Sequence, residues 1–501
     1  MHKEPPLAHT VNSMQAEVFL LRLSSDYRKN VDTMHALLRV DDSFDLIERT
    51  LTVGKDEMTL YYIDGFVKDG EMQRIMQYFF GLEGLGEGQD AARVFASSHV
   101  PYVEVDCTED TDTLITMVLS GATALLGSTF GGTAIVIDAR TYPSRSTEEP
   151  SSDKVIQGSH DGFVETLIFN TALIRRRLRT PNLTVKYTSV GSESRSDIAL
   201  VYMEDRVDRE YLAKIEERLS AITAKNLAMG TQSLTEVFVP RRWYNPFPKV
   251  RLIERPDAAA ACISEGSIIL LCDTSPQAMV LPTAIFDFLQ ESDDYYMPPL
   301  TGTYLRVLRI LILILSFCLT PTWYLLLQNR EILPPALAFI LPQDTGALPI
   351  LLQLLLVELA VDGLKLASMN TPDLLANSLS VIGALLLGEF AVSLGWLSEA
   401  VIFYMAVVTI AAFSQQNYEL GYAIKFLRII TLLLTALLGV VGYVLGLVIV
   451  SVCLLTNRTA SGTRGYLYPL FPFNGKALLR LLIRLPKSRV DGKQETKEQK
   501  K

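Results

Sequence analysis

The stretch ILILILSFCLTPTWYLLL at residues 310–327 decides the fold class, because it runs for 18 residues without a charge. A helix of about 20 apolar residues spans the hydrocarbon core of a bilayer, so this segment is long enough to cross one. Pro321 lies inside it, and a packed membrane helix tolerates proline. The stretch therefore predicts an integral membrane protein.

Four further apolar segments extend this membrane region. They cover residues 348–366, 378–397, 400–413 and 429–455. The last segment has 27 residues and three glycines, so it is either one tilted helix or a tight pair with a glycine bend. We therefore expect an all-α polytopic transmembrane bundle over residues 305–456, with five to six crossings. The short run LPPALAFIL at 333–341 is expected to be re-entrant or interfacial.

Basic residues flank these segments and indicate which ends face the cytoplasm. Arg306 and Arg309 precede the first segment, and Lys425 and Arg428 precede the last. Because cytoplasmic ends of membrane helices are enriched in Lys and Arg, both pairs are expected on the cytoplasmic side.

The segment after the bundle, residues 457–485, is expected to lie on the membrane surface. Lys476, Arg480 and Arg484 are spaced four apart, so a helix places them on one face. A basic amphipathic helix is typical of a segment at the lipid headgroups. The charged tail at residues 486–501 is expected to be disordered.

Charged residues are sparse in the membrane region and frequent outside it. Between Ile310 and Leu455, 12 of 146 residues are charged, against 20% in the whole chain. No apolar signal-peptide core follows the polar N-terminus, so the N-terminal half is expected to stay in the cytoplasm. The formal net charge of −9 argues against nucleic acid as a partner. The five cysteines are scattered without a CxxC pair, so neither a disulfide framework nor a metal site is expected.

The N-terminal half alternates strand-like and helix-like patterns, which predicts a soluble α/β region with two subdomains. Residues 1–45 are expected to form an extension, residues 46–145 the first subdomain and residues 154–298 the second. A Ser/Pro/Glu-rich stretch at 144–153 is the expected linker.

Within the first subdomain, the patterns predict strands at 102–105 and 133–138 with an amphipathic helix over 110–126 between them, a βαβ-like order. Within the second, they predict a strand pair at 267–271 and 278–281, joined by a turn of the sequence Asp-Thr-Ser-Pro.

Three ionisable residues in the second apolar segment are candidates for function. Glu358, Asp362 and Lys365 are spaced four and three apart, so they share one helix face. Charges in the hydrocarbon layer are costly and face a partner or an aqueous path. They therefore belong either to an ion pathway or gate, or to an internally paired structural cluster.

The third apolar segment carries a continuous stripe of small and polar residues. The stripe consists of Asn377, Ser380, Ala384 and Gly388. It could line a pore, or it could serve close helix packing, since both use small residues. Glu389 lies about 100° from the stripe and is a candidate for the pore rim or for a partner of Lys365.

Other motifs do not indicate a nucleotide-binding site or a catalytic site. The glycines between 81 and 88 lack the Gly-Lys-Ser/Thr of a phosphate loop, and GSTFGG at 127–132 is not a dinucleotide fingerprint. The basic run at 175–177 could bind an acidic partner or headgroups, but a solvated helix face is the expected role. No nucleophile–base pairing stands out, so neither catalytic residues nor a cofactor is expected and the protein is not expected to be an enzyme.

Several segments resemble the GerA family of spore germination receptor A-subunits. They are YYIDGFVKD (61–69), GSHDGFVETLIFNTALIRRRLRTPNL (158–183), RPDAAAACISEGSIILLCDTSPQAMVLPTAIFDFLQESDDYY (255–296), LPPALAFI, LLVELAVDGLKLAS and IGALLLGEFAV. Within the family, three further segments are more similar to a sporulation paralogue than to a nutrient-receptor subunit proper. These are WYNPFPKVRLIERPD (243–257), SQQNYELGYAIKFLRI (414–429) and YPLFPFNGKALLRLLIR (468–484). One departure is the sequence QGSHD at 157–161, where the family has an arginine-bearing turn.

The resemblance implies a protein of the spore inner membrane in an endospore-forming bacterium. It also implies a homo-oligomer of A-type subunits around an ion-conducting path, with small membrane partner proteins, contact with membrane lipid, and ion release during germination. The alternatives are a nutrient germinant receptor A-subunit that signals without conducting, and a secondary transporter. A transporter would need inverted repeats, and the membrane segments have no convincing internal symmetry.

Overall fold

The computed structural model describes residues 22–88, 90–142, 158–239, 243–291, 293–342, 345–370, 385–415, 417–460 and 465–484, and also residues 381, 383 and 462. The linker expected at 144–153 and the C-terminal tail at 486–501 lie outside these residues. By internal contacts the chain divides into two units. The first contains both sheets and ends at Pro282, and the second contains the C-terminal helices from Thr283 onward together with residues 243–249.

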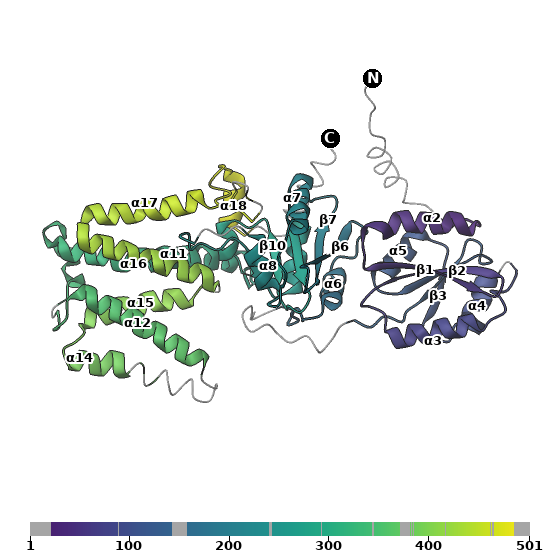
Figure 1. The fold of residues 1–501 in the computed structure, drawn as a ribbon, viewed down its shortest axis with the longest axis horizontal. Coiled ribbons are helices and arrows are strands. Elements are labelled where there is room, and N and C mark those ends of the chain that lie inside the picture. Colours follow the sequence, from purple (N-terminus) through teal and green to yellow (C-terminus); the bar gives the residue numbers. More distant parts are fainter. Residues whose placement is uncertain are drawn as a thin grey trace, which may run out of the picture. The chain divides into compact units, whose positions relative to one another are not determined.

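The first sheet of unit 1 has five strands in the order β1-β2-β4-β5-β3, all antiparallel to their neighbours. Figure 1 labels β1, β2 and β3 of this sheet and the helices beside it. The strands are β1 (Leu46–Val53), β2 (Asp56–Ile63), β3 (Val105–Thr108), β4 (Thr123–Gly127) and β5 (Ala134–Ile137). The helices are α2 (Tyr27–Leu38), α3 (Asp69–Phe80), α4 (Ala91–His99) and α5 (Thr111–Leu119). Alternate strand residues enter two separate cores, one with α2 and α5 and the other with α3 and α4. Helices therefore cover both faces of the sheet.

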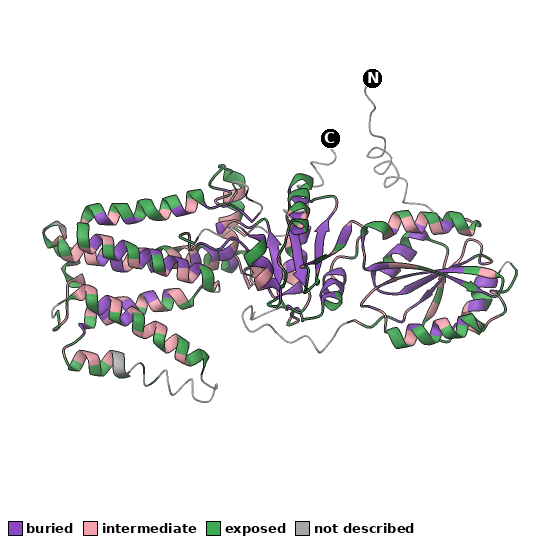
Figure 2. Cartoon of the chain, in the orientation of Figure 1, coloured by how far each residue is buried: buried purple, intermediate pink, exposed green. Residues whose placement is uncertain are grey.

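The second sheet repeats this arrangement strand for strand. Its order is β6-β7-β9-β10-β8, again antiparallel throughout. The strands are β6 (Leu183–Val190), β7 (Ser196–Met203), β8 (Arg251–Ile253), β9 (Ile268–Cys272) and β10 (Ala278–Leu281). The helices are α6 (Leu167–Arg175), α7 (Arg209–Ser220), α8 (Thr231–Phe238) and α9 (Pro256–Ser264). In both sheets most strand residues are buried (Figure 2).

A matching pair of asparagines supports the internal repeat. The side chain of Asn30 in α2 bonds both backbone groups of Ser24, at 2.7 Å each. The side chain of Asn170 in α6 bonds both backbone groups of Val164, at 2.8 and 2.6 Å. Each asparagine is fully or nearly buried and bonds the residue six positions before it, ahead of the first strand of its sheet. The two subdomains therefore share the same side-chain-to-backbone hydrogen bonds, which are not evident from the sequence.

The expected α/β class with two subdomains is confirmed, but two details differ. Neighbouring strands run antiparallel, whereas a βαβ order implies parallel strands. The helix expected over 110–126 ends at Leu119, and the rest of that range forms β4. Gly121 has φ of 103°, which L side chains rarely adopt, and it ends the helix there. The expected strand pair at 267–271 and 278–281 is confirmed as β9 and β10.

Unit 2 consists mainly of helices. They are α10 (Asp293–Tyr296), α11 (Pro299–Gln328), α12 (Ile350–Met369), α14 (Ala391–Ser393), α15 (Glu399–Phe413), α16 (Tyr418–Leu438), α17 (Val440–Thr456) and α18 (Gly475–Leu482). A π-helical segment at Leu385–Phe390 leads into α14. Among the described helices, α11 and α16 are long and apolar enough to cross a membrane, and α15 and α17 are apolar but shorter. The short run at 333–341 contains a 3-10 helix, Pro335–Ile340.

The long apolar segment at 429–455 is two helices, which decides between the two forms expected for it. Gly439 separates α16 from α17 with φ of 60° and ψ of −133°. Gly442 and Gly446 of α17 then approach α16 closely. A Cβ on Gly442 would lie 1.9 Å from the Leu434 carbonyl oxygen, and one on Gly446 would lie 2.5 Å from Thr431 Cγ2. The glycines therefore allow a close helical hairpin.

Substituting Gly442 is expected to destabilise this hairpin. In Gly442→Ala the new methyl group meets backbone, which cannot rotate away, so the helices must separate at a cost of about 1–3 kcal/mol. The matched control is Gly421→Ala in α16, where a Cβ meets nothing within 4 Å. Thermal unfolding of the purified full-length protein in detergent checks the prediction. Equal melting temperatures for the two variants would contradict the close approach.

Candidate functional site

A cluster of charges joins three helices of unit 2. Arg428 of α16 is 3% exposed, and its Nη2 donates to both carboxylate oxygens of Glu358 in α12, at 2.7 and 2.8 Å. Its Nη1 donates to the backbone oxygen of Ser316 in α11 at 2.9 Å. One guanidinium group therefore ties three helices together, and its charge is balanced by the glutamate.

Lys425, one turn before Arg428, adds a second cation to this cluster. Its Nζ lies 3.1 Å from Glu358 Oε1 and also contacts the carboxylate of Asp362. Lys365 of α12 makes a different contact, because its Nζ lies 4.5 Å and 4.8 Å from the ring centroids of Tyr418 and Tyr422. These are cation–π distances.

The structure brings the three ionisable candidates together with partners from α16. Glu358 and Asp362 face Arg428 and Lys425, as an internally paired cluster would. From sequence, those two cations are expected only at the cytoplasmic end of a helix and not as partners of the carboxylates. Their spacing was the available signal, since residues three apart on α16 can match residues four apart on α12.

The stripe on the third apolar segment is only partly described. Asn377, Ser380 and Ala384 lie outside the described residues. Gly388 and Glu389 lie in the π-helical segment, where a Cβ on Gly388 would meet nothing within 4 Å and Glu389 is exposed. Single π-helical turns recur at functional sites. Pore lining by this stripe stays a prediction.

A second buried charge cluster holds the start of α11. Asp294 is 0% exposed, and each of its carboxylate oxygens accepts from Arg309 Nη1 at 2.8 Å. Arg306 Nε donates to the same carboxylate at 3.3 Å, and Arg309 Nη2 lies 2.5 Å from Glu291 Oε2. The two arginines expected to mark the cytoplasmic side therefore also fix the first long helix to the segment before it.

The carboxyl of Glu291 is expected to make stability depend on pH. Burial raises its pKa to about 7, with Arg309 opposing and Asp294 adding to the shift. A raised pKa means that the folded state binds the proton more tightly. The stabilisation is present below the ordinary value of 4.5 and is lost as pH rises through about 7. The melting temperature should therefore fall between about pH 5 and pH 8. Glu291→Gln should flatten this profile, and Glu399→Gln, at an exposed residue, should not.

Only Arg176 of the basic run in unit 1 is exposed, so the run as a whole is not the solvated face expected of it. Arg175 is 0% exposed, and its Nε and Nη2 donate to Asp45 at 2.8 and 2.9 Å. Arg177 pairs with Asp161 at 2.6 Å, and Arg176 lies 4.2 Å from the ring centroid of Tyr142. The acid of the divergent QGSHD turn is thus an internal partner of this run.

In the part of the chain that the structure describes, no group of three or more His, Cys, Asp or Glu side chains is placed to hold a metal ion.

Comparisons with known proteins point to one family. The chain matches the family model of the Bacillus/Clostridium GerA spore germination protein over residues 34–496. It is 34% identical to stage V sporulation protein AF of Bacillus subtilis (strain 168) over 468 residues, which are 93% of this chain and 94% of that protein. It is 26% identical to spore germination protein KA of the same organism, over 89% of this chain and 82% of that protein. A crystal structure of the N-terminal domain of the A subunit of the Bacillus megaterium spore germinant receptor GerK3 is 19% identical, with a TM-score of 0.39, covering 52% of this chain and 97% of that one.

Proposed function

Since this chain belongs to the GerA family of spore germination proteins, which it matches over residues 34–496, we propose that it is a membrane subunit whose copies assemble around an ion-conducting path. The path releases ions during germination. The protein acts in the spore inner membrane with its N-terminal unit on the cytoplasmic or core side, and small membrane proteins associate with it.

The observation that carries the conducting role is the exposure of Glu389. This carboxylate lies within an apolar π-helical segment that also contains Gly388. A charge at membrane depth is costly unless it faces water or a neighbouring subunit. An aqueous path between copies of the chain provides such surroundings, and the open space at Gly388 leaves room for it.

The paired cluster on α12 and α16 has a different role in this proposal. Glu358 and Arg428 satisfy each other at 2.7 Å, so neither presents a free charge to a passing ion. The cluster instead fixes the surrounding helices, against which the third segment is positioned. We therefore assign ion conduction to the stripe that includes Gly388 and not to the ion pairs.

A bulky residue at the stripe is expected to block ion release. Gly388→Trp places an indole where a Cβ meets nothing within 4 Å, so the subunit should fold while the path is obstructed. Ion release from germinating spores that carry only this variant should fall at least about tenfold, with the protein still in the membrane. The matched control is Gly363→Trp on α12, which has equally open space. Normal release by Gly388→Trp would remove the pore assignment and favour a signalling subunit that does not conduct.

A further inference from the structure

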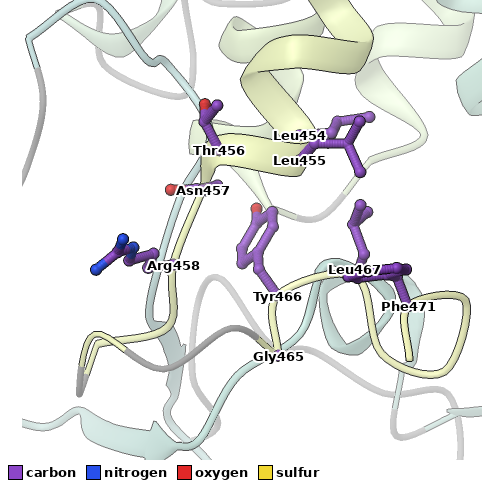
Figure 3. A pocket seen from close by; sticks show the side chains of 9 residues that line it. All are labelled: Leu454, Leu455, Thr456, Asn457, Arg458, Gly465, Tyr466, Leu467 and Phe471. Carbon is purple, nitrogen blue, oxygen red and sulfur yellow. The ribbon is translucent and has the colours of Figure 1, made fainter.

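A cavity of about 320 Å³ lies at the C-terminal end of α17, within unit 2 (Figure 3). One side is the last turn of the helix and the residues after it, Leu454 to Arg458. The other side is the turn from Gly465 to Phe471. The lining is thus half apolar, from leucine and phenylalanine side chains, and half polar. An amphiphilic ligand fits such a lining better than a purely apolar or purely ionic one.

Asn457 gives the cavity an unsatisfied polar group. This residue is 5% exposed, and its Oδ1 is buried without a hydrogen-bond partner in the described part of the chain. The nearby Tyr466 hydroxyl donates its proton to the Pro248 carbonyl at 2.7 Å, so it has none left for Oδ1. Burial raises the pKa of Tyr466, and its side-chain hydrogen bond with Asn457, in which only the amide N–H can donate, opposes that shift. A buried carbonyl oxygen without a donor is costly, so a ligand that offers an N–H or O–H would gain affinity here.

Arg458 supplies a positive charge beside this amide. Its side chain lines the cavity and is exposed to solvent. A guanidinium group matches the geometry of a phosphate, to which it can donate two parallel hydrogen bonds. Together the two residues present a cation and a carbonyl acceptor to one ligand.

The place of the cavity in the chain fits a lipid. It begins where the apolar helix α17 ends, so it lies where that helix would leave the hydrocarbon layer. The turn beyond it exposes Tyr468, Phe471 and Phe473, and aromatic side chains of this kind concentrate at headgroup level.

We infer that this cavity binds the headgroup of an anionic glycerophospholipid, with its phosphate on Arg458, a headgroup hydroxyl donating to Asn457 Oδ1, and the acyl region against Leu455 and Phe471. The inference rests on the membrane location and is independent of ion conduction. It also predicts a headgroup preference. A choline headgroup has no N–H or O–H to donate to Oδ1, whereas a glycerol headgroup has two hydroxyls.

Binding of short-chain lipids to the full-length protein in detergent tests the inference. Native mass spectrometry should give dioctanoyl phosphatidylglycerol an affinity about tenfold above that of dioctanoyl phosphatidylcholine. Arg458→Gln and Asn457→Leu should each lower the phosphatidylglycerol affinity at least about fivefold. Arg480→Gln, a basic residue of α18 outside the cavity lining, should leave it unchanged. Equal affinities for the two lipids, or no loss in Arg458→Gln, would overturn the site.

Two further binding measurements separate loss of the lipid site from misfolding and from recognition of a free phosphate ester. Gly465→Leu narrows the cavity without touching a charge, because a Cβ there meets only Thr459 Cγ2, at 3.7 Å. It should lower lipid affinity, and it carries the test if Asn457→Leu fails to fold. Glycerol 3-phosphate should compete only at concentrations at least about a hundredfold higher than the lipid. Competition at equal concentration would mean that the site recognises a free phosphate ester, and would overturn the lipid assignment.

Discussion

Replacing Arg428 by methionine is expected to remove most of the protein from the membrane fraction. The substitution keeps the apolar volume but leaves Glu358, inside a helix bundle, without the Nη2 group that donates to both of its carboxylate oxygens. Breaking a buried ion pair in this way costs about 3–5 kcal/mol. Lys425 remains 3.1 Å from the same carboxylate, so the loss should fall at the lower end of that range. Immunoblots of membrane fractions and the melting temperature of the residual purified protein measure the effect.

The matched control neutralises both partners. In the double variant Glu358→Gln with Arg428→Met, no uncompensated charge remains, so most of the lost stability should return. A double variant as unstable as Arg428→Met alone would mean that the helices are held by packing around the arginine stem and not by charge pairing. Tyr422→Phe serves as a third comparison, because it keeps the aromatic face beneath Lys365 and should behave as the wild type.

Replacing Asp45 by alanine is expected to have a comparable effect on the N-terminal unit. Asp45 is 1% exposed and accepts two hydrogen bonds from Arg175, which is 0% exposed. The residue follows α2 of the first subdomain, whereas its partner ends α6 of the second, so the pair joins the two repeats. Removing the carboxylate leaves a guanidinium group buried without a counter-charge, at a cost of about 3–5 kcal/mol.

Limited proteolysis and thermal unfolding of the full-length protein check this prediction. Asp45→Ala should become susceptible to protease within unit 1, whereas Arg176→Ala should not, because that side chain is exposed and only lies over the Tyr142 ring. Restored resistance in Asp45→Asn with Arg175→Met would identify charge compensation as the cause. Unchanged resistance in Asp45→Ala would show that the pair contributes little to joining the repeats.

The sequence was sufficient to predict the classes of structure but not the pairing of its elements. Hydrophobic runs predicted the membrane region, and the helix period placed Glu358 and Asp362 on one face. Their cations lie 63 or more residues away in sequence, and no local pattern connects such positions. The internal repeat is not recognisable in the sequence for a similar reason. The two subdomains share their topology and a buried asparagine that bonds the backbone before it. Loops of different length separate the equivalent strands, however, so no fixed period appears in the sequence.

The prediction of a helix over 110–126 is wrong in its C-terminal part because of a single residue. The apolar residues of α5 and β4 are contiguous in sequence, and hydrophobic spacing alone does not separate a buried helix from a buried strand over such a short range. Gly121, with its positive φ, sets the boundary between α5 and β4. For the candidate pore, residue spacing predicts a stripe, and of its four residues only Gly388 lies among the described residues.

Conductance of the purified full-length protein in a planar bilayer tests the central claim most directly. The proposal predicts discrete current steps that Gly388→Trp abolishes and Gly363→Trp preserves. It also predicts that Glu389→Lys changes the reversal potential measured in a salt gradient toward lower cation selectivity, because the proposal places this exposed carboxylate beside the path. Folded, oligomeric protein that carries no current, or current that Gly388→Trp leaves unchanged, would contradict the account.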